Sequence, residues 1–132
     1  MVDKIKKSKE KWKEILTEEQ YRVTRGKGTE APFVGKYYNY DQKGIYKCIN
    51  CGLELFSSEK KYDSGSGWPS FWEVIDKDHI DYKVDKSLGM ARTEILCAAC
   101  GAHLGHIFND GPQPTGKRYC VNSIALGFDK KD

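Results

Sequence analysis

Five cysteines are the residues of this 132-residue sequence best suited to chemistry, and four of them form two matching pairs. Residues 48–52 and 97–101 both read CxxCG, a spacing that lets a tight turn direct two sulfur atoms toward one point. Two such turns supply the four thiolates of a tetrahedral site, which zinc favours and which leaves no coordination position open. The sequence therefore predicts one structural zinc ion bound by Cys48, Cys51, Cys97 and Cys100.

Other chemistry is open to the same cysteine pairs. Four thiolates also bind iron, and a CxxC pair can act as a redox dithiol of the thioredoxin kind. Two matched copies without a strand–helix–strand pattern around them favour the metal site over the redox dithiol.

The fifth cysteine, Cys120, is left over, and the odd count argues against a complete disulfide framework. A free cysteine is commonly a buried apolar residue, and this interpretation stays open for Cys120 taken alone. If residues 118–123 form a strand, Arg118 and Asn122 lie on the same face as Cys120. A cation beside a thiol lowers its pKa and supplies thiolate, so this neighbourhood predicts a reactive cysteine.

Two histidines and an aromatic loop are further candidates for a catalytic site. His103 and His106 directly follow the second cysteine pair, and Asp110 is placed to orient the tautomer of a histidine. By themselves, two histidines three residues apart are more often surface or core residues. Residues 65–72 (GSGWPSFW) predict a loop that grips an apolar, uncharged group, although the last two rings are expected in the core.

Helical patterns are confined to about the first 30 residues. Ser8 is placed to cap a short helix whose apolar residues recur at helical spacing, namely Trp12, Ile15 and Leu16. Thr17 and Gln20 form a capping box for a second short helix that Gly26 can end. We expect both helices to pack on the main body, because isolated helices this short are marginal in water.

The rest of the chain reads as short strands separated by turns rich in Gly and Pro. The expected strands are residues 44–47, 53–56, 80–84, 91–96 and 119–128. In the third, apolar and polar residues alternate as in a half-buried strand, with Ile80, Tyr82 and Val84 on the apolar side. The prediction is a single mostly β domain, residues 1–132, in which residues 1–30 form a helical extension packed on the β body.

Composition and charge argue against several other classes of protein. No apolar run approaches the roughly 20 residues that a membrane helix needs, and the lysine-rich start has no apolar region of a secretory signal. The cytoplasm is therefore the expected location. The net charge of +3 and the pI near 8.5 predict solvated surface charge and no nucleic-acid partner.

Four motifs follow one another along the chain: CxxCG at 48–52, YDSGSGWPSF at 62–71, CxxCGAHLGHIF at 97–108 and DGPQPTGKRYCVNS at 110–123. Together they resemble the methionine-R-sulfoxide reductases of the B type. The resemblance implies two antiparallel sheets, barrel-like and related to zinc ribbons, with the zinc site away from the catalytic centre. It also implies reduction of methionine-R-sulfoxide in oxidised proteins or peptides, with the free amino acid as a further candidate substrate.

The resemblance gives each candidate residue a role. Cys120 is the nucleophile, Trp68 holds the methyl group of the substrate, and Phe108 also binds the substrate. The polar side of the site is formed by His103, His106, Asn122, Arg118 and Asp110.

The sequence departs from the family at Ser66, where many members have a cysteine that resolves the oxidised nucleophile into a disulfide. Because the other four cysteines are the expected zinc ligands, we expect a one-cysteine enzyme. Its Cys120 sulfenic acid is then reduced directly by an external thiol, and thioredoxin, the usual reductant of the family, is an open question.

The expected chemistry is attack of a thiolate on the electrophilic sulfur of the sulfoxide. Charge builds on the sulfoxide oxygen, which needs a proton or a hydrogen bond. His103 or His106, with an ordinary pKa of about 6.5, can supply it near neutrality. Two other functions are weighed against this one. A zinc module that binds a protein partner explains only the cysteine pairs, and a thiol peroxidase explains only the lone cysteine.

Overall fold

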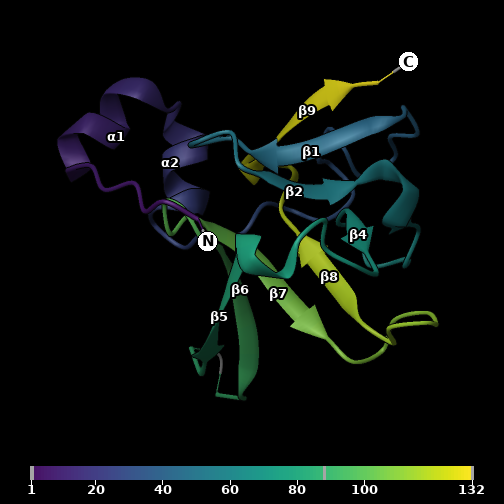
Figure 1. The fold of residues 1–132 in the computed structure, drawn as a ribbon. Helices are drawn as coiled ribbons and strands as arrows, with labels where there is room; N and C mark the ends of the chain where they lie inside the picture. The colour runs from purple at the N-terminus through teal and green to yellow at the C-terminus, as the bar shows by residue number, and fades with distance from the viewer. Residues whose placement is uncertain (1, 88, 132) are drawn as a thin grey trace.

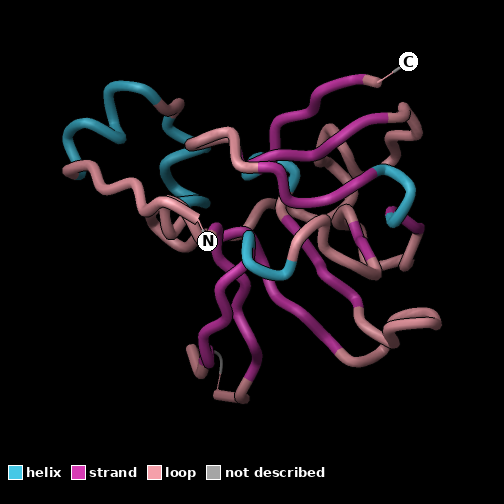
Figure 2. The backbone as a smooth tube through the Cα atoms, viewed as in Figure 1, coloured by secondary structure: helices cyan, strands magenta, loops and turns pink. Residues whose placement is uncertain are grey.

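The computed structural model describes residues 2–87 and 89–131, and these residues form a mostly β fold of two antiparallel sheets with two short α-helices (Figures 1 and 2). The three-stranded sheet has the order β2 (Glu54–Ser57), β1 (Gly44–Cys48), β9 (Leu126–Lys130). The six-stranded sheet has the order β3 (Lys61–Tyr62), β4 (Ser70–Phe71), β8 (Arg118–Val121), β7 (His103–Phe108), β6 (Arg92–Cys97), β5 (Ile80–Asp85). The predicted fold class is confirmed.

Both helices begin at the residues that the sequence identifies as caps. α1 (Lys9–Ile15) starts after Ser8, whose hydroxyl accepts a hydrogen bond from the backbone of Lys11 at 3.2 Å. α2 (Glu18–Thr24) starts after Thr17, and the capping box with Gln20 is formed in both directions. These signals are local, which is why the sequence alone predicts them.

The apolar side expected for α1 is only partly correct. Trp12 is buried and the guanidinium of Arg25 lies 4.9 Å from the centre of its ring, but Ile15 is 50% exposed. α1 is seven residues long and lies at the outer side of α2 (Figure 1), so only a narrow strip of its surface reaches the rest of the protein.

The alternation in β5 does not correspond to burial. Tyr82 and Val84 are 49% and 62% exposed, whereas Ile80 and Asp85 at the two ends of the strand are buried. β5 is an edge strand, and its hairpin with β6 projects from the rest of the fold in Figure 1. The prediction of a half-buried strand is therefore wrong, since the sequence pattern cannot show that the strand lies at an edge.

The single strand expected at residues 119–128 is two strands in different sheets. β8 and β9 are separated by a 3₁₀ turn, Ser123–Ala125, closed by a 3.0 Å hydrogen bond from the Ala125 N–H to the Asn122 carbonyl. β8 pairs with β4 and β7, whereas β9 pairs with β1. The turn therefore carries the chain from one sheet to the other.

Aromatic rings join the two sheets. Phe71 of β4 stacks on Phe56 of β2, with ring centroids 4.3 Å apart, and also contacts Tyr46 of β1 at 5.1 Å. All three rings are fully buried. Trp72, also expected in the core, is only half-buried, with the Lys60 ammonium 4.3 Å from its ring centre. In the described part of the chain, no helix has the length and apolar character needed to cross a membrane.

Candidate active site and metal centre

The four paired cysteines converge on one point. Each CxxC segment starts at the last residue of a strand, Cys48 of β1 and Cys97 of β6. The four Sγ atoms lie within 4.8 Å of one another, with 3.7 Å between Cys48 and Cys100 and 3.5 Å between Cys51 and Cys97. Sulfur atoms about 2.3 Å from a tetrahedral zinc ion are about 3.8 Å apart, so this geometry fits such an ion. These four residues are positioned to hold a metal ion.

Glycine follows each pair because of its backbone conformation. Gly52 and Gly101 have φ of +83° and +76°, the left-handed region that residues with a Cβ avoid. Their N–H groups donate to the carbonyls of Cys48 and Cys97 at 2.8 and 2.9 Å. A Cβ at either position would meet no atom within 4 Å, so the backbone conformation, and not a lack of space, calls for glycine.

Cys120 lies in β8, within a row of side chains that crosses the six-stranded sheet. The strand register places it opposite Ser70 of β4 on one side and His106 of β7 on the other, and His106 opposite Glu94 of β6. Directly opposite residues of antiparallel strands point to the same face of a sheet. His106 therefore stands beside the predicted nucleophile, and the buried Glu94 follows it.

Burial and charge act on the Cys120 thiol in opposite directions. Burial raises the pKa of Cys120 above its ordinary value, while the Arg118 charge and the Ser66 hydroxyl act to lower it. The expected cation, Arg118, is thus present. The prediction that the pKa of Cys120 is lowered is wrong, because the effect of burial exceeds the effect of the Arg118 charge. The guanidinium of Arg118 also lies 4.3 Å from the centre of the Phe108 ring. Arg118 and Phe108 are directly opposite each other in β8 and β7, two residues along from the Cys120–His106 pair.

Asp110 binds Arg118 and does not contact a histidine. The Arg118 Nε and Nη2 atoms donate to the two carboxylate oxygens of Asp110 at 2.8 and 3.2 Å. This hydrogen bonding lowers the pKa of Asp110 below its ordinary value. The prediction that Asp110 orients a histidine is wrong, and its place is to fix the guanidinium that neighbours Cys120.

Two buried carboxylates orient the histidines. The His103 Nδ1 atom lies 2.6 Å from Oε2 of Glu94, and the His106 Nε2 atom lies 2.7 Å from Oδ2 of Asp85. The two imidazole rings are 5.6 Å apart. Burial lowers the pKa of His103, although its hydrogen bond to Glu94 acts in the opposite direction. The hydrogen bond from His106 holds the pKa of Asp85 well below its usual range.

Neither carboxylate is among the site residues predicted from the sequence. Glu94 carries a signal that was available, because it is an acidic residue directly before the apolar residues of an interior strand. Asp85 carries none, since it stands at the end of a strand, where a polar residue is ordinary.

Asn122 and Trp68 are both tied to one residue of the N-terminal segment. The Glu30 N–H donates to Oδ1 of Asn122, and the Glu30 carbonyl accepts from Nε1 of Trp68, both at 3.0 Å. Nδ2 of Asn122 also donates to the Leu104 carbonyl at 3.1 Å. Asn122 is buried, while Trp68 is half-buried and keeps part of its ring accessible.

Ser66 lies beside Cys120. Its hydroxyl is close enough to favour the Cys120 thiolate, and it accepts a hydrogen bond from Ser64 at 2.8 Å. The serine is therefore beside Cys120 but has no sulfur with which to form a disulfide.

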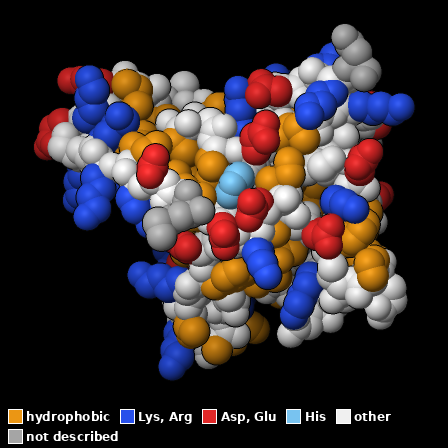
Figure 3. Space-filling model, viewed as in Figure 1, with side chains coloured by type: hydrophobic (Ala, Val, Ile, Leu, Met, Phe, Trp, Pro, Cys, Tyr) orange, Lys and Arg blue, Asp and Glu red, His pale blue; other side chains and the backbone are white. Residues whose placement is uncertain are grey.

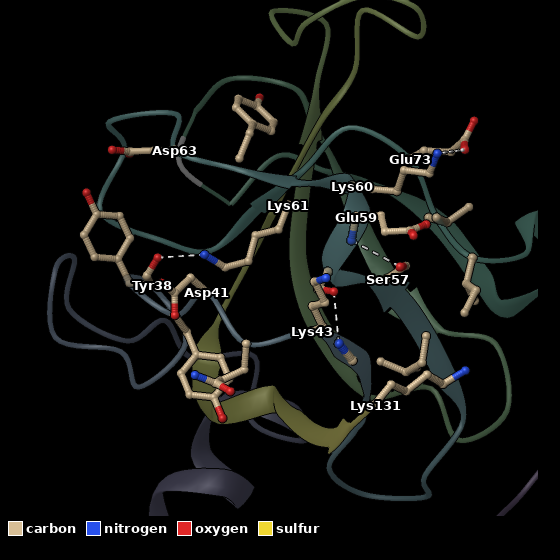
Figure 4. Close-up of a pocket in the computed structure, with 18 of the residues that line it drawn as sticks. Tyr38, Asp41, Lys43, Ser57, Glu59, Lys60, Lys61, Asp63, Glu73 and Lys131 are labelled. Atoms are coloured by element: carbon tan, nitrogen blue, oxygen red, sulfur yellow. Dashed lines mark hydrogen bonds and ion pairs between the residues drawn. The ribbon is translucent and has the colours of Figure 1, made fainter.

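A cavity of about 1050 Å³ lies elsewhere on the molecule (Figure 4). None of the predicted site residues lines it. In the close-up, the Lys61 ammonium donates to the Tyr38 carbonyl at 2.9 Å, and Lys60 pairs with Glu73 at 3.6 Å. Basic and acidic side chains are likewise interspersed over the face of the molecule drawn in Figure 3. The cavity is separate from the candidate active site.

The chain matches known proteins over almost its full length. The family model described as the SelR domain matches residues 16–130. The peptide methionine sulfoxide reductase MsrB of Hahella chejuensis is 61% identical over 131 residues, which are 99% of this chain and 94% of that protein. The proteins of the same name from Methanosarcina mazei and Leptospira interrogans are 56% and 57% identical, over 98% and 96% of this chain and 93% and 97% of their own lengths. The chain therefore belongs to the SelR domain family.

Proposed function

We propose that this chain is a reductase of methionine-R-sulfoxide in proteins and that Cys120 is its nucleophile. The observation that carries the proposal is the position of Cys120, which shares one face of the sheet with His106 and has Arg118 and Ser66 beside it. The relatives named as peptide methionine sulfoxide reductases, at 56% to 61% identity, support the reaction class.

In the proposed reaction, the Cys120 thiolate attacks the sulfoxide sulfur. A sulfur–sulfur bond forms transiently, and the protonated oxygen is transferred to the Cys120 sulfur as the sulfur–oxygen and sulfur–sulfur bonds to the substrate break. Methionine then leaves as the thioether, and Cys120 is left as a sulfenic acid. The cysteine loses the two electrons that the sulfoxide gains. Because burial disfavours the thiolate, Arg118 is needed to hold its charge, and Asp110 holds Arg118.

We assign proton donation to the sulfoxide oxygen to His106. It stands opposite Cys120 in the register, and its Nδ1 atom is available because Nε2 faces Asp85. His103 is more deeply buried and burial lowers its pKa, so it holds a proton less readily. In this proposal His103 forms the wall of the polar side, and Asn122 holds the backbone around it through Leu104.

The apolar part of the substrate is assigned to the aromatic residues. Trp68 is half-buried and fixed through Nε1, so one part of its ring is accessible to a methyl group. Phe108 is held under the Arg118 guanidinium on the same side of the sheet as Cys120. Selectivity for the R epimer follows if the methyl group and the oxygen are held in two different places.

The metal ion is proposed to be one zinc ion, held by Cys48, Cys51, Cys97 and Cys100. With four thiolates bound, zinc has no open position, so it stabilises the fold and takes no part in the reaction. The thiols that bind it must stay reduced, which suits a reducing compartment such as the cytoplasm.

The reductant is proposed to be an external thiol that attacks the Cys120 sulfenic acid and releases water. A second thiol then frees Cys120 as a disulfide of the reductant forms. The absence of sulfur at Ser66 supports direct attack. Direct attack on the sulfenic acid is compatible with a small thiol or with thioredoxin as the reductant.

The test is turnover of the separate R and S epimers of a methionine sulfoxide peptide, with dithiothreitol as reductant. We expect the R epimer alone to be reduced, and Cys120→Ser to abolish the reaction while its thermal unfolding stays close to that of the parent protein. Equal turnover of both epimers, or turnover retained by Cys120→Ser, would show the assignment to be wrong.

A further inference from the structure

The loop after α2 reaches into the candidate active site. Nζ of Lys27 lies 3.5 Å from Oδ1 of Asp85 and 3.3 Å from Oε1 of Glu94. The other oxygen of each carboxylate faces a histidine, Oδ2 of Asp85 facing His106 and Oε2 of Glu94 facing His103. One ammonium group therefore contacts both of the carboxylates that orient the two histidines.

Burial makes this cation important. The side chains of Asp85 and Glu94 are 2% and 3% exposed, and an ionised carboxylate so deeply buried is costly without a partner of opposite charge. Arg92 gives Asp85 a second cation at 3.5 Å. Among the described residues, Lys27 is the only lysine or arginine paired with Glu94.

The backbone around Lys27 is fixed from both sides. Lys27 has φ of +60°, a left-handed conformation that costs an ordinary residue on the order of 1 kcal/mol. Just before it, the Arg25 guanidinium donates to the Cys100 carbonyl of the metal centre at 2.7 Å. Just after it, Glu30 bonds Asn122 and Trp68 through its backbone. A strained residue held between two anchors indicates that the position of its side chain matters.

We propose that Lys27 is a positioning residue for the sulfoxide reduction, holding Asp85 and Glu94 so that they fix the rings of His106 and His103. The proposal rests on the function proposed above. It gives the N-terminal segment, which the sequence suggests only as a packed helical extension, a part in the chemistry of the site.

The two carboxylates determine which ring nitrogens of His103 and His106 are available to the substrate. An ionised carboxylate only accepts hydrogen bonds, so Nδ1–H of His103 donates to Glu94 and Nε2–H of His106 donates to Asp85. Nε2 of His103 and Nδ1 of His106 are thereby left for the substrate. Without Lys27, the carboxylates lose a shared cation and the rings lose a fixed orientation.

The test compares Lys27→Met with Lys27→Arg. Lys27 does not touch the substrate in this proposal, so Lys27→Met should lower kcat about tenfold with little change in KM. Lys27→Arg, which keeps the charge, should recover most of the loss. Lys47→Met is the matched control, because it removes a 2.9 Å pair with Asp129 on the other sheet and should leave kcat unchanged.

A second readout does not depend on turnover. The Lys27 charge lowers the pKa of His103, so Lys27→Met should move the ring-proton titration of His103 to higher pH in nuclear magnetic resonance spectra. The charged and titratable groups close to this ring are Glu94 of β6, His106 of β7 and Lys27 itself.

The proposal is overturned if Lys27→Met leaves both kcat and the His103 titration unchanged. It is also overturned if activity falls only in proportion to the fraction of unfolded protein, or if Lys27→Arg is as impaired as Lys27→Met. A parent protein without reductase activity but with the shifted titration would instead contradict the proposed function and leave the contact network in place.

Discussion

At the scale of single residues, the reactivity of Cys120 depends on a balance that the sequence indicates only in part. The sequence shows that a cation lies near the thiol, because Arg118 and Cys120 are two residues apart in one strand and share a face. The sequence does not show how deeply Cys120 is buried, because the strands that cover it are distant in the chain. Burial raises the pKa of Cys120, and Arg118 lowers it again.

Replacing Arg118 by Leu should therefore make the thiol less reactive at neutral pH. With the cation removed, the pKa of Cys120 rises further, so the midpoint of its pH-dependent alkylation by iodoacetamide should move to higher pH. Lys47→Leu is the control, since it removes a pair with Asp129 on the other sheet. An unchanged or lower midpoint in Arg118→Leu would contradict this account of the cysteine.

At the scale of helices and strands, local signals are predicted well and tertiary relations are not. Signals that depend on only a few neighbouring residues are confirmed. They are the helix caps at Ser8 and Thr17 and the two CxxC turns that bring the four cysteines together. The break between β8 and β9 and the exposure of Tyr82 in β5 depend on which strands lie alongside. The contacts of Glu94 and Asp85 with the histidines are tertiary relations of the same kind, so the sequence does not predict these contacts.

The metal centre joins the end of β1 to the end of β6, which are far apart in the chain. Removing the metal ion should therefore disrupt the packing of both strands. Binding of structural zinc contributes on the order of 10 kcal/mol, comparable to the whole stability of a typical domain. A strong chelator should therefore abolish the cooperative thermal transition followed by circular dichroism, and added zinc should restore it. Cys120→Ser should behave like the parent protein. A chelated protein that melts at the parent temperature would contradict the structural role.

At the scale of the whole molecule, the N-terminal segment is connected both to the four-cysteine cluster and to the residues around Cys120. Arg25 bonds the Cys100 carbonyl, Lys27 reaches the carboxylates, and Glu30 bonds both Asn122 and Trp68. The sequence motifs predict the metal ligands and the nucleophile. They do not identify this connection, because Lys27 and Glu30 lie in a stretch without a recognised chemical pattern. The organisation as one domain stays a prediction.

The central claim is that Cys120 itself takes the oxygen of the sulfoxide and has no resolving partner. The most direct measurement is mass spectrometry of the protein after a single turnover on the R epimer, without any thiol reductant, with Ser66→Cys analysed beside it. We predict one added oxygen on Cys120 for each methionine formed in the parent protein, and a disulfide between positions 66 and 120 in Ser66→Cys. Methionine formed while Cys120 stays unmodified, or a disulfide to one of the metal-binding cysteines in the parent protein, would contradict the account.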